Sequence, residues 1–120
     1  MFTLRKEQFA VFERMEIAKF ENPVYLRLNE LFPEKCQDFG EALVRNLIRY
    51  GIQRAASYEI LGAVDVRTYI DVMMLLGPDF DKDPNYPWAE KLLRDKNVTD
   101  PGVRVARVHE TAVKLQSEKA

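Results

Sequence analysis

The sequence predicts an all-α fold, a single domain over residues 1–120 with five or six helices in an irregular, orthogonal bundle. Three observations predict it. Prolines and glycines stand where helices would start or stop, apolar residues recur at helical spacing, and only residues 103–105 alternate with the two-residue period of a strand. The chain has 120 residues, of which 47% are hydrophobic and 31% charged. That balance is typical of a globular domain large enough to bury a core.

Two helices are expected in the first quarter of the chain. A first helix is predicted over residues 4–21, because apolar residues recur there at helical spacing. Asn22 followed by Pro23 is typical of an N-cap with proline at the first helical position, so a second helix is expected over residues 23–31. A short turn is then expected over residues 33–38.

Two longer helices are expected in the middle of the chain. The first spans residues 41–58 and contains Gly51, which costs up to ~1 kcal/mol relative to alanine inside a helix. We expect another helix to pack closely against this glycine. The second spans residues 63–76, with Gly62 as its N-cap and a stop at Gly77.

The last third of the chain predicts a loop and two further helices. The loop covers residues 77–86, and Pro87 then opens a short helix that ends near residue 94. The pair Asp100-Pro101 is typical of a helix start, so the last helix is expected over residues 101–116. This start signal favours helix over strand for residues 103–105.

Composition excludes several classes of function. Eighteen basic and nineteen acidic residues leave a net charge of −1, which disfavours a strongly basic nucleic-acid binder. The chain has one cysteine, Cys36, and one histidine, His109, too few for a disulfide framework, a thiolate zinc site or most transition-metal sites. No glycine-rich phosphate loop is present. We therefore predict a protein that is not an enzyme, with no catalytic residues, cofactor or metal.

Membrane insertion and secretion are not expected either. The longest apolar cluster, Val72–Leu76, is far shorter than the ~20 residues that span a bilayer. The N-terminal apolar stretch is interrupted at once by Arg5, Lys6 and Glu7, unlike a signal peptide. The sequence predicts a cytoplasmic protein with no membrane partner and no nucleic-acid partner.

The acidic loop has the spacing of a calcium site but not its chemistry. Asp79, Asp81 and Asp83 recur at every second residue and Glu90 follows, as in an EF-hand loop. Pro84 occupies the position where that loop requires glycine for its sharp turn. We therefore favour aspartates that cap and solvate the loop over a calcium site.

Aromatic residues flank these aspartates. Phe80, Tyr86 and Trp88 are expected to anchor the loop to the core, and the anchored loop is an alternative surface for a partner. The first helix offers another such surface. Leu4, Val11, Phe12, Met15 and Ala18 form its core stripe. Phe9 and Phe20 fall outside that stripe and widen the apolar arc, which indicates either burial between two layers or a patch for a partner.

Several segments in a fixed order carry a family resemblance. They are Phe32-Pro33-Glu34-Lys35-Cys36, the run from Ile48 to Tyr58, the run from Asp65 to Met73, Leu76-Gly77-Pro78-Asp79-Phe80-Asp81, Asp83-Pro84 and Pro87-Trp88-Ala89. Together they resemble a family of small bacterial proteins encoded beside type VI secretion effectors, their adaptors and spike-tip proteins. The resemblance covers roughly residues 5–110. Glu59 departs from an expected helix-ending glycine, and Leu61 from an expected capping serine or threonine.

The resemblance implies a non-catalytic, protein-binding accessory: an adaptor, co-adaptor or chaperone that helps to load a toxin effector. The expected partner is another protein, namely an effector, an adaptor or a toxin. The candidate protein-binding residues are Phe9, Phe20, Phe80, Asp81, Tyr86 and Trp88. The alternative is an immunity protein that neutralises a cognate toxin, because such genes share the same loci. A metal-dependent or hydrolytic enzyme is a third, more remote hypothesis.

Overall fold

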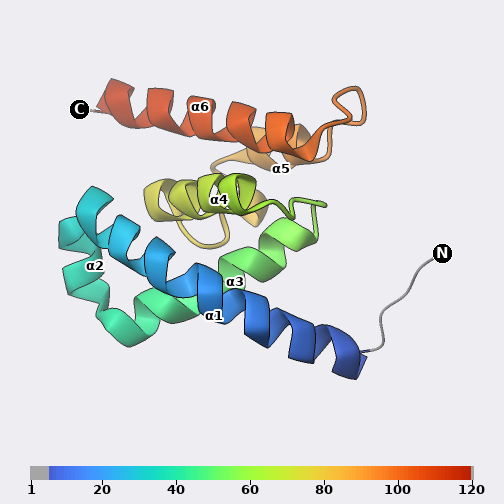
Figure 1. Ribbon diagram of the computed structural model, residues 1–120. Coiled ribbons are helices and arrows are strands. Elements are labelled where there is room, and N and C mark those ends of the chain that lie inside the picture. Colours follow the sequence, from blue (N-terminus) through green and yellow to red (C-terminus); the bar gives the residue numbers. More distant parts are fainter. Residues whose placement is uncertain (1–5, 120) are drawn as a thin grey trace. The chain divides into compact units, whose positions relative to one another are not determined.

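A computed structural model describes residues 6–119 of the chain, with the side chains of residues 6–16, 18 and 119 outside the description. Across this range the chain forms helices and no strand, which confirms the all-α prediction (Figure 1). The elements are α1 (Lys6–Leu31), α2 (Pro33–Phe39), α3 (Glu41–Ala56), α4 (Ala63–Leu76), the short 3-10 helix η1 (Phe80–Lys82), α5 (Pro87–Leu93) and α6 (Pro101–Lys119). Within these residues, no helix is both long enough and apolar enough to cross a bilayer.

Internal contacts divide the chain into two compact units, and the division falls inside α3. Unit 1 ends at Arg45 and unit 2 begins at Asn46. Each unit is described by itself below. The single domain over residues 1–120 stays a prediction.

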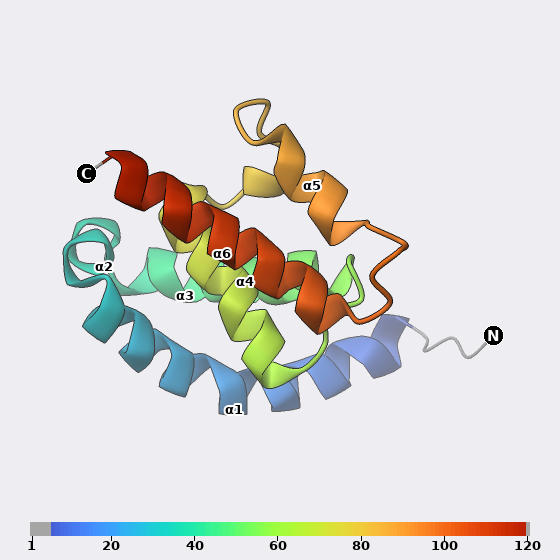
Figure 2. The same ribbon diagram turned by 90° about the horizontal axis from the view of Figure 1, so that it is seen from above.

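The prediction of two helices before residue 32 is wrong, because α1 is one helix with Pro23 inside it. Proline removes one hydrogen-bond donor and bends a helix without necessarily ending it, and α1 is bowed along its length (Figure 2). Asn22 does not act as the cap, since its Oδ1 accepts a hydrogen bond from Arg45 Nη2 at 3.0 Å. Val24 and Leu28 are buried at helical spacing beyond the proline, so the same face continues.

The expected turn over residues 33–38 is a seven-residue helix, α2, that packs against α1. Pro33 starts it, because its fixed backbone angle suits the first helical position. Gly40 ends it with a φ of 84°, and its N–H donates to the Cys36 carbonyl at 2.9 Å. A positive φ of this kind favours glycine. Cys36 is buried on the inner face of the helix.

In unit 2, α4 and α6 run side by side in the same direction (Figure 1). At their starting ends, a Cβ atom on Gly102 would lie 2.6 Å from Asp65 Oδ2. Further along, Gln116 Nε2 donates to the Leu75 carbonyl at 3.1 Å. The boundaries of α4 match the prediction at both ends, and residues 103–105 are helical as predicted. α5 packs on α6 and on η1.

The packing of α3 against α4 explains Gly51, as the sequence predicted. A Cβ atom at Gly51 would lie 2.7 Å from Ile70 Cγ1 and 2.9 Å from Met73 Sδ. Such distances are too short for a side chain, so glycine is required for the close approach. α4 is buried on most sides through its middle turns; its buried residues are Val66, Tyr69, Ile70, Asp71, Val72, Met73 and Met74.

Candidate functional site

The turn after α3 holds a glutamate in a backbone conformation that favours glycine. Glu59 has a φ of 66°, the one positive φ of a non-glycine residue in the described chain. Its N–H donates to Ala56 at 2.9 Å, and the N–H of Ile60 donates to Ala55 at 3.0 Å. These two bonds form a Schellman motif, in which the left-handed position is usually glycine. Buried Ile60 supplies the hydrophobic contact that accompanies the motif.

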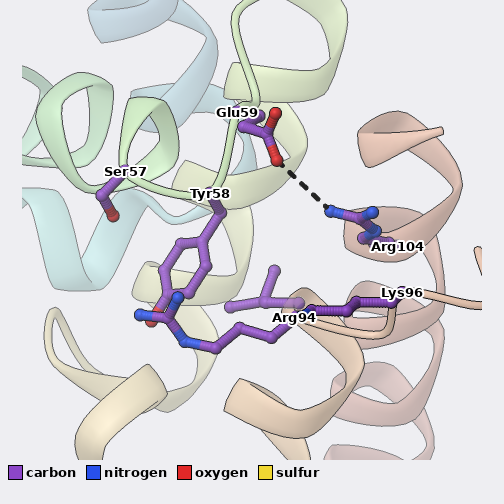
Figure 3. A pocket seen from close by; sticks show the side chains of 7 residues that line it. Ser57, Tyr58, Glu59, Arg94, Lys96 and Arg104 are labelled. Atoms are coloured by element: carbon purple, nitrogen blue, oxygen red, sulfur yellow. Dashed lines mark ion pairs between the residues drawn. The ribbon is translucent and has the colours of Figure 1, made fainter. Parts of the chain in front are cut away.

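Directly beside this turn lies a pocket of about 200 Å³, which we call the basic pocket (Figure 3). It is lined by Ser57, Tyr58, Glu59, Leu93, Arg94, Lys96 and Arg104. Three of these side chains are cations and one is a carboxylate. The lining residues come from the turn after α3, from the end of α5 with the loop after it, and from the first turn of α6.

Arg104 is the most enclosed cation of the basic pocket. Its side chain is 12% exposed, and its Nε donates to the Val98 carbonyl at 2.6 Å. Nη1 lies 3.9 Å from Glu59 Oε1, across the pocket (Figure 3). That distance is an ion pair and longer than a hydrogen bond. The Glu59 side chain itself is 81% exposed, so its carboxylate is largely solvated.

Arg94 covers the aromatic wall of the basic pocket. Its guanidinium carbon lies 4.8 Å from the ring centre of Tyr58, a cation–π contact (Figure 3). Arg94 Nε also donates to Glu90 Oε2 at 3.2 Å, and Lys82 forms a second ion pair with the same oxygen. The hydrogen bond from Lys82 and, as the second cause, the one from Arg94 lower the pKa of Glu90, because both stabilise its carboxylate.

Behind Tyr58 lies a buried polar network around Asp81, which is only 2% exposed. The Tyr58 hydroxyl donates to Asp81 Oδ2 at 2.5 Å, and Arg54 forms an ion pair with the same oxygen. Burial is the main cause of the raised pKa values of Tyr58 and Tyr69, because a tyrosinate would be poorly solvated there. Within the described residues, Asp81 Oδ1, Arg54 Nε and the Tyr69 hydroxyl have no hydrogen-bond partner.

An aromatic chain fixes this network to the core of unit 2. The ring centres of Tyr58 and Tyr69 lie 6.3 Å apart, and those of Tyr69 and Phe80 lie 5.0 Å apart. Tilted pairs at these distances are favourable. The wall of the basic pocket is therefore held from behind by the ion pair and by packed rings, which makes it a rigid surface.

The three aspartates of the acidic loop have separate partners. Asp79 accepts a hydrogen bond from the Tyr50 hydroxyl, Asp81 enters the buried network, and Asp83 Oδ1 accepts from the Asn85 N–H at 2.8 Å. The part of the chain that the structure describes contains no group of three or more Asp, Glu, His or Cys side chains that could hold a metal ion. Here the alternating aspartates serve packing and turn formation.

The predicted protein-binding residues have different environments. Phe80 is fully buried and Asp81 nearly so, which corrects the prediction that these two side chains contact a partner. Tyr86 and Trp88 are half-buried and pack edge to face with ring centres 6.1 Å apart. Phe20 is half-buried in α1, and the Phe9 side chain lies outside the described residues. For Tyr86, Trp88, Phe20 and Phe9, partner binding stays a prediction.

A set of exposed apolar side chains lies on the chain segments next to the basic pocket, and sequence reasoning missed it. It consists of Leu61, Val64 and Val103, which are 76%, 63% and 41% exposed; we call it the apolar patch. The start of α4 and the start of α6 meet here, because the Asp65 carboxylate lies beside both Gly62 and Gly102. The sequence did contain a signal. Glu59 and Leu61, the two residues that differ from the glycine and the capping serine or threonine expected there, both fall in this one turn.

The single cysteine and the single histidine have ordinary environments. Cys36 is buried, and burial raises the pKa of its thiol, so it behaves as a small apolar side chain. His109 is half-buried on α6.

Comparison with known proteins yields no relative. No protein family, no curated protein and no solved structure matches this chain.

Proposed function

We propose that this protein is a non-catalytic accessory that binds another protein, and that the apolar patch is part of the surface it uses. One observation carries the proposal. Among the large apolar side chains that the structure describes, Leu61 and Val64 are the two most exposed, and the start of α6, which carries the exposed Val103, approaches the start of α4. Single exposed apolar side chains are common on soluble proteins, whereas clustered ones mark interaction surfaces.

The energetics of the apolar patch favour such a role. Burying a valine or leucine side chain is worth about 1.5–3 kcal/mol relative to leaving it exposed. The patch lies on a turn that is held by the Schellman bonds of Glu59 and Ile60 and on the starts of two packed helices. A pre-ordered surface loses little conformational entropy on binding. The patch therefore suits a stable complex.

The family resemblance supplies the identity of the partner in this proposal. Proteins of the family it resembles are encoded beside type VI secretion effectors and adaptors, so we propose that the partner is such an effector or adaptor. The protein would act in the cytoplasm as an adaptor, co-adaptor or chaperone during effector loading.

The experiment has two stages. Tagged protein is first captured from cells that carry its native gene neighbourhood, and the partner is identified by mass spectrometry and purified. The Kd is then measured for wild type, Leu61→Ser and Val64→Ser. We expect each variant to bind at least tenfold more weakly, with an unchanged melting temperature, because the residues are exposed in the free protein.

Val113→Ser is the matched control, because Val113 is an exposed valine on α6 outside the apolar patch. It should bind like wild type. Equal affinities for Leu61→Ser, Val64→Ser and wild type would contradict the proposal. Phe20→Ala, Tyr86→Ala and Trp88→Ala in the same assay test the remaining predicted contacts. Rescue of cells from a cognate toxin by this protein alone would instead identify an immunity protein.

A further inference from the structure

We infer that the basic pocket binds a carboxylate of the protein partner, from an acidic side chain that follows or precedes an apolar side chain docked on the apolar patch. This inference rests on the proposed function, because it names the chemistry of the partner segment. It is carried by the charge and size of the pocket, by the strained backbone of Glu59 and by the adjacency of pocket and patch.

The charge of the basic pocket favours an anion. Arg94, Lys96 and Arg104 line it, against the one carboxylate of Glu59. The enclosed Arg104 donates its Nε–H to the Val98 carbonyl, and its Nη1 lies at ion-pair distance from Glu59. A guanidinium offers a planar pair of donors that matches a carboxylate, and such bonds are stronger where solvent is excluded.

The volume indicates one side chain as the occupant. Sites for drug-sized molecules and cofactors usually measure ~300–1,000 Å³. The basic pocket, at about 200 Å³, is smaller. A glutamate or aspartate side chain with part of its backbone fits this space, and the rest of the partner would lie outside it.

Glu59 places its own carboxylate in the basic pocket, where we infer that the carboxylate of the partner binds. Its carboxylate is the one anion in the pocket lining, yet it lies 3.9 Å from Arg104 and remains largely exposed. It can move into solvent without breaking a short hydrogen bond to that arginine. Its positive φ of 66° is strained for a residue with a side chain, and strain of this kind clusters at functional sites.

The apolar patch and the basic pocket are built from the same two chain segments, the turn before α4 and the start of α6. Leu61 follows Glu59 by two residues, and Val103 immediately precedes Arg104. The ion-pair distance between Glu59 and Arg104 and the close approach of Asp65 to Gly102 show that these two segments lie near each other. A short peptide segment with one acidic and one apolar side chain can therefore contact the basic pocket and the apolar patch at the same time.

The test uses defined peptides and the full chain. N-acetyl-leucyl-glutamyl-leucine amide, its glutaminyl analogue and inorganic phosphate are titrated while NMR follows the Arg104 Nε–H signal and the amides of residues 59–62. We expect saturable shifts with the glutamyl peptide and at least tenfold weaker binding of the glutaminyl peptide. Phosphate alone should shift the Arg104 signal without the amides of Leu61 and Gly62.

Variants separate the pocket from general charge. Arg104→Gln and Lys96→Gln should each weaken binding of the glutamyl peptide at least fivefold, and exposed Lys96 keeps the test valid if Arg104→Gln is unstable. Glu59→Gln should strengthen binding severalfold, since it removes the competing carboxylate. Arg107→Gln, an exposed cation one turn further along α6, is the matched control and should leave binding unchanged.

Equal binding of the two peptides, or equal effects of Arg104→Gln and Arg107→Gln, would overturn the inference. So would phosphate binding that reproduces every shift of the peptide, because the pocket would then be a site for free anions. With the purified partner, loss of binding in Leu61→Ser but not in Lys96→Gln or Arg104→Gln would disprove the pocket inference and leave the proposed function standing.

Discussion

Arg45 and Arg54 lie on the same helix, α3, and each anchors a network of carboxylates, but their surroundings differ. In unit 1, Arg45 Nη1 donates to Glu21 Oε2 at 2.8 Å and its Nε donates to Glu41 Oε2 at 2.9 Å. Its guanidinium also lies 4.3 Å from the ring centre of Tyr25. Arg45 thus links α1 to the start of α3 through the nearly buried Glu21, whose side chain is 10% exposed, and the exposed Glu41.

In unit 2, Arg54 meets a carboxylate that water does not reach. The Asp81 side chain has no exposed surface, and its second oxygen has no hydrogen-bond partner among the described residues. Removing one partner of a buried pair leaves the other charge uncompensated, whereas exposed pairs contribute little. The comparison teaches that the burial of the carboxylate, rather than the number of bonds, decides the energetic weight of each arginine.

The largest effect is expected from Arg54→Met, which removes the cation and retains an apolar stem. It leaves the buried Asp81 carboxylate with the Tyr58 hydroxyl as its remaining hydrogen-bond donor, so we expect a loss of ~3–5 kcal/mol in the free energy of unfolding. Asp81→Asn should cost less, because the partly exposed Arg54 can turn to solvent. Urea denaturation measures both. A loss below ~1 kcal/mol for Arg54→Met would remove the contrast with unit 1.

High pH should destabilise unit 2 through its buried tyrosines. Tyr58 and Tyr69 have raised pKa values in the folded protein, so above about pH 10 the folded state holds more protons than the unfolded state. Stability is therefore complete below that pH and falls above it, by up to ~1.4 kcal/mol per pH unit for each tyrosine. Urea midpoints across this range measure the slope, which Tyr58→Phe should reduce. An unchanged slope in that variant would contradict the assignment.

Gly51→Ala tests the close approach of α3 to α4. The new methyl group would meet Ile70 and Met73 at 2.7 and 2.9 Å. Overpacking costs ~1–3 kcal/mol and outweighs the gain of ~1 kcal/mol in helix propensity, so we expect net destabilisation. Thermal unfolding measures it. A higher melting temperature would show that α4 yields easily at this contact.

Glu59→Gly should stabilise the protein by about 1 kcal/mol, because glycine adopts a positive φ without the steric cost that glutamate carries. This gain would show that Glu59 is kept at the expense of stability. Gly40→Ala is the converse control, since Gly40 has a φ of 84° with open space around it, and it should destabilise. A destabilised Glu59→Gly would mean that the ion pair with Arg104 outweighs the strain.

A smaller change is expected from Arg45→Met in unit 1. Its partners Glu41 and Asn22 are exposed and can turn to water, and the Glu21 side chain is 10% exposed whereas that of Asp81 has no exposed surface, so the urea midpoint should shift less than in Arg54→Met. The remaining shift should shrink in about 0.5 M salt, because salt screens exposed charges more than buried ones. A shift as large as that of Arg54→Met would show that both networks are equally important.

Local signals in the sequence predicted most of the helices. Gly62 and Gly77 bound α4 as predicted, and Pro87 and Pro101 open α5 and α6. These signals work because each acts on its own turn of helix. The same rules failed at Pro23, where the buried face of α1 continues through a residue that usually marks a helix start.

The candidate site was only partly predictable. Glu59 and Leu61 stood out as departures from the expected residues of their turn, and the structure found a positive φ and an exposed leucine there. The cations could not be found in this way. Lys96 and Arg104 belong to different elements and meet only because α5 packs on α6.

By itself the sequence determined the all-α class, the positions of most helix ends and the glycine at the contact of α3 with α4. Tertiary structure alone decided that Asp81 lies inside the protein with Arg54 and Tyr58, and that the starts of α4 and α6, with the exposed Leu61, Val64 and Val103, lie close together. The physical reason is the separation in sequence over which each kind of interaction acts. Caps and turns are set by residues within a few positions, whereas burial and charge pairing depend on side chains that are distant in the chain.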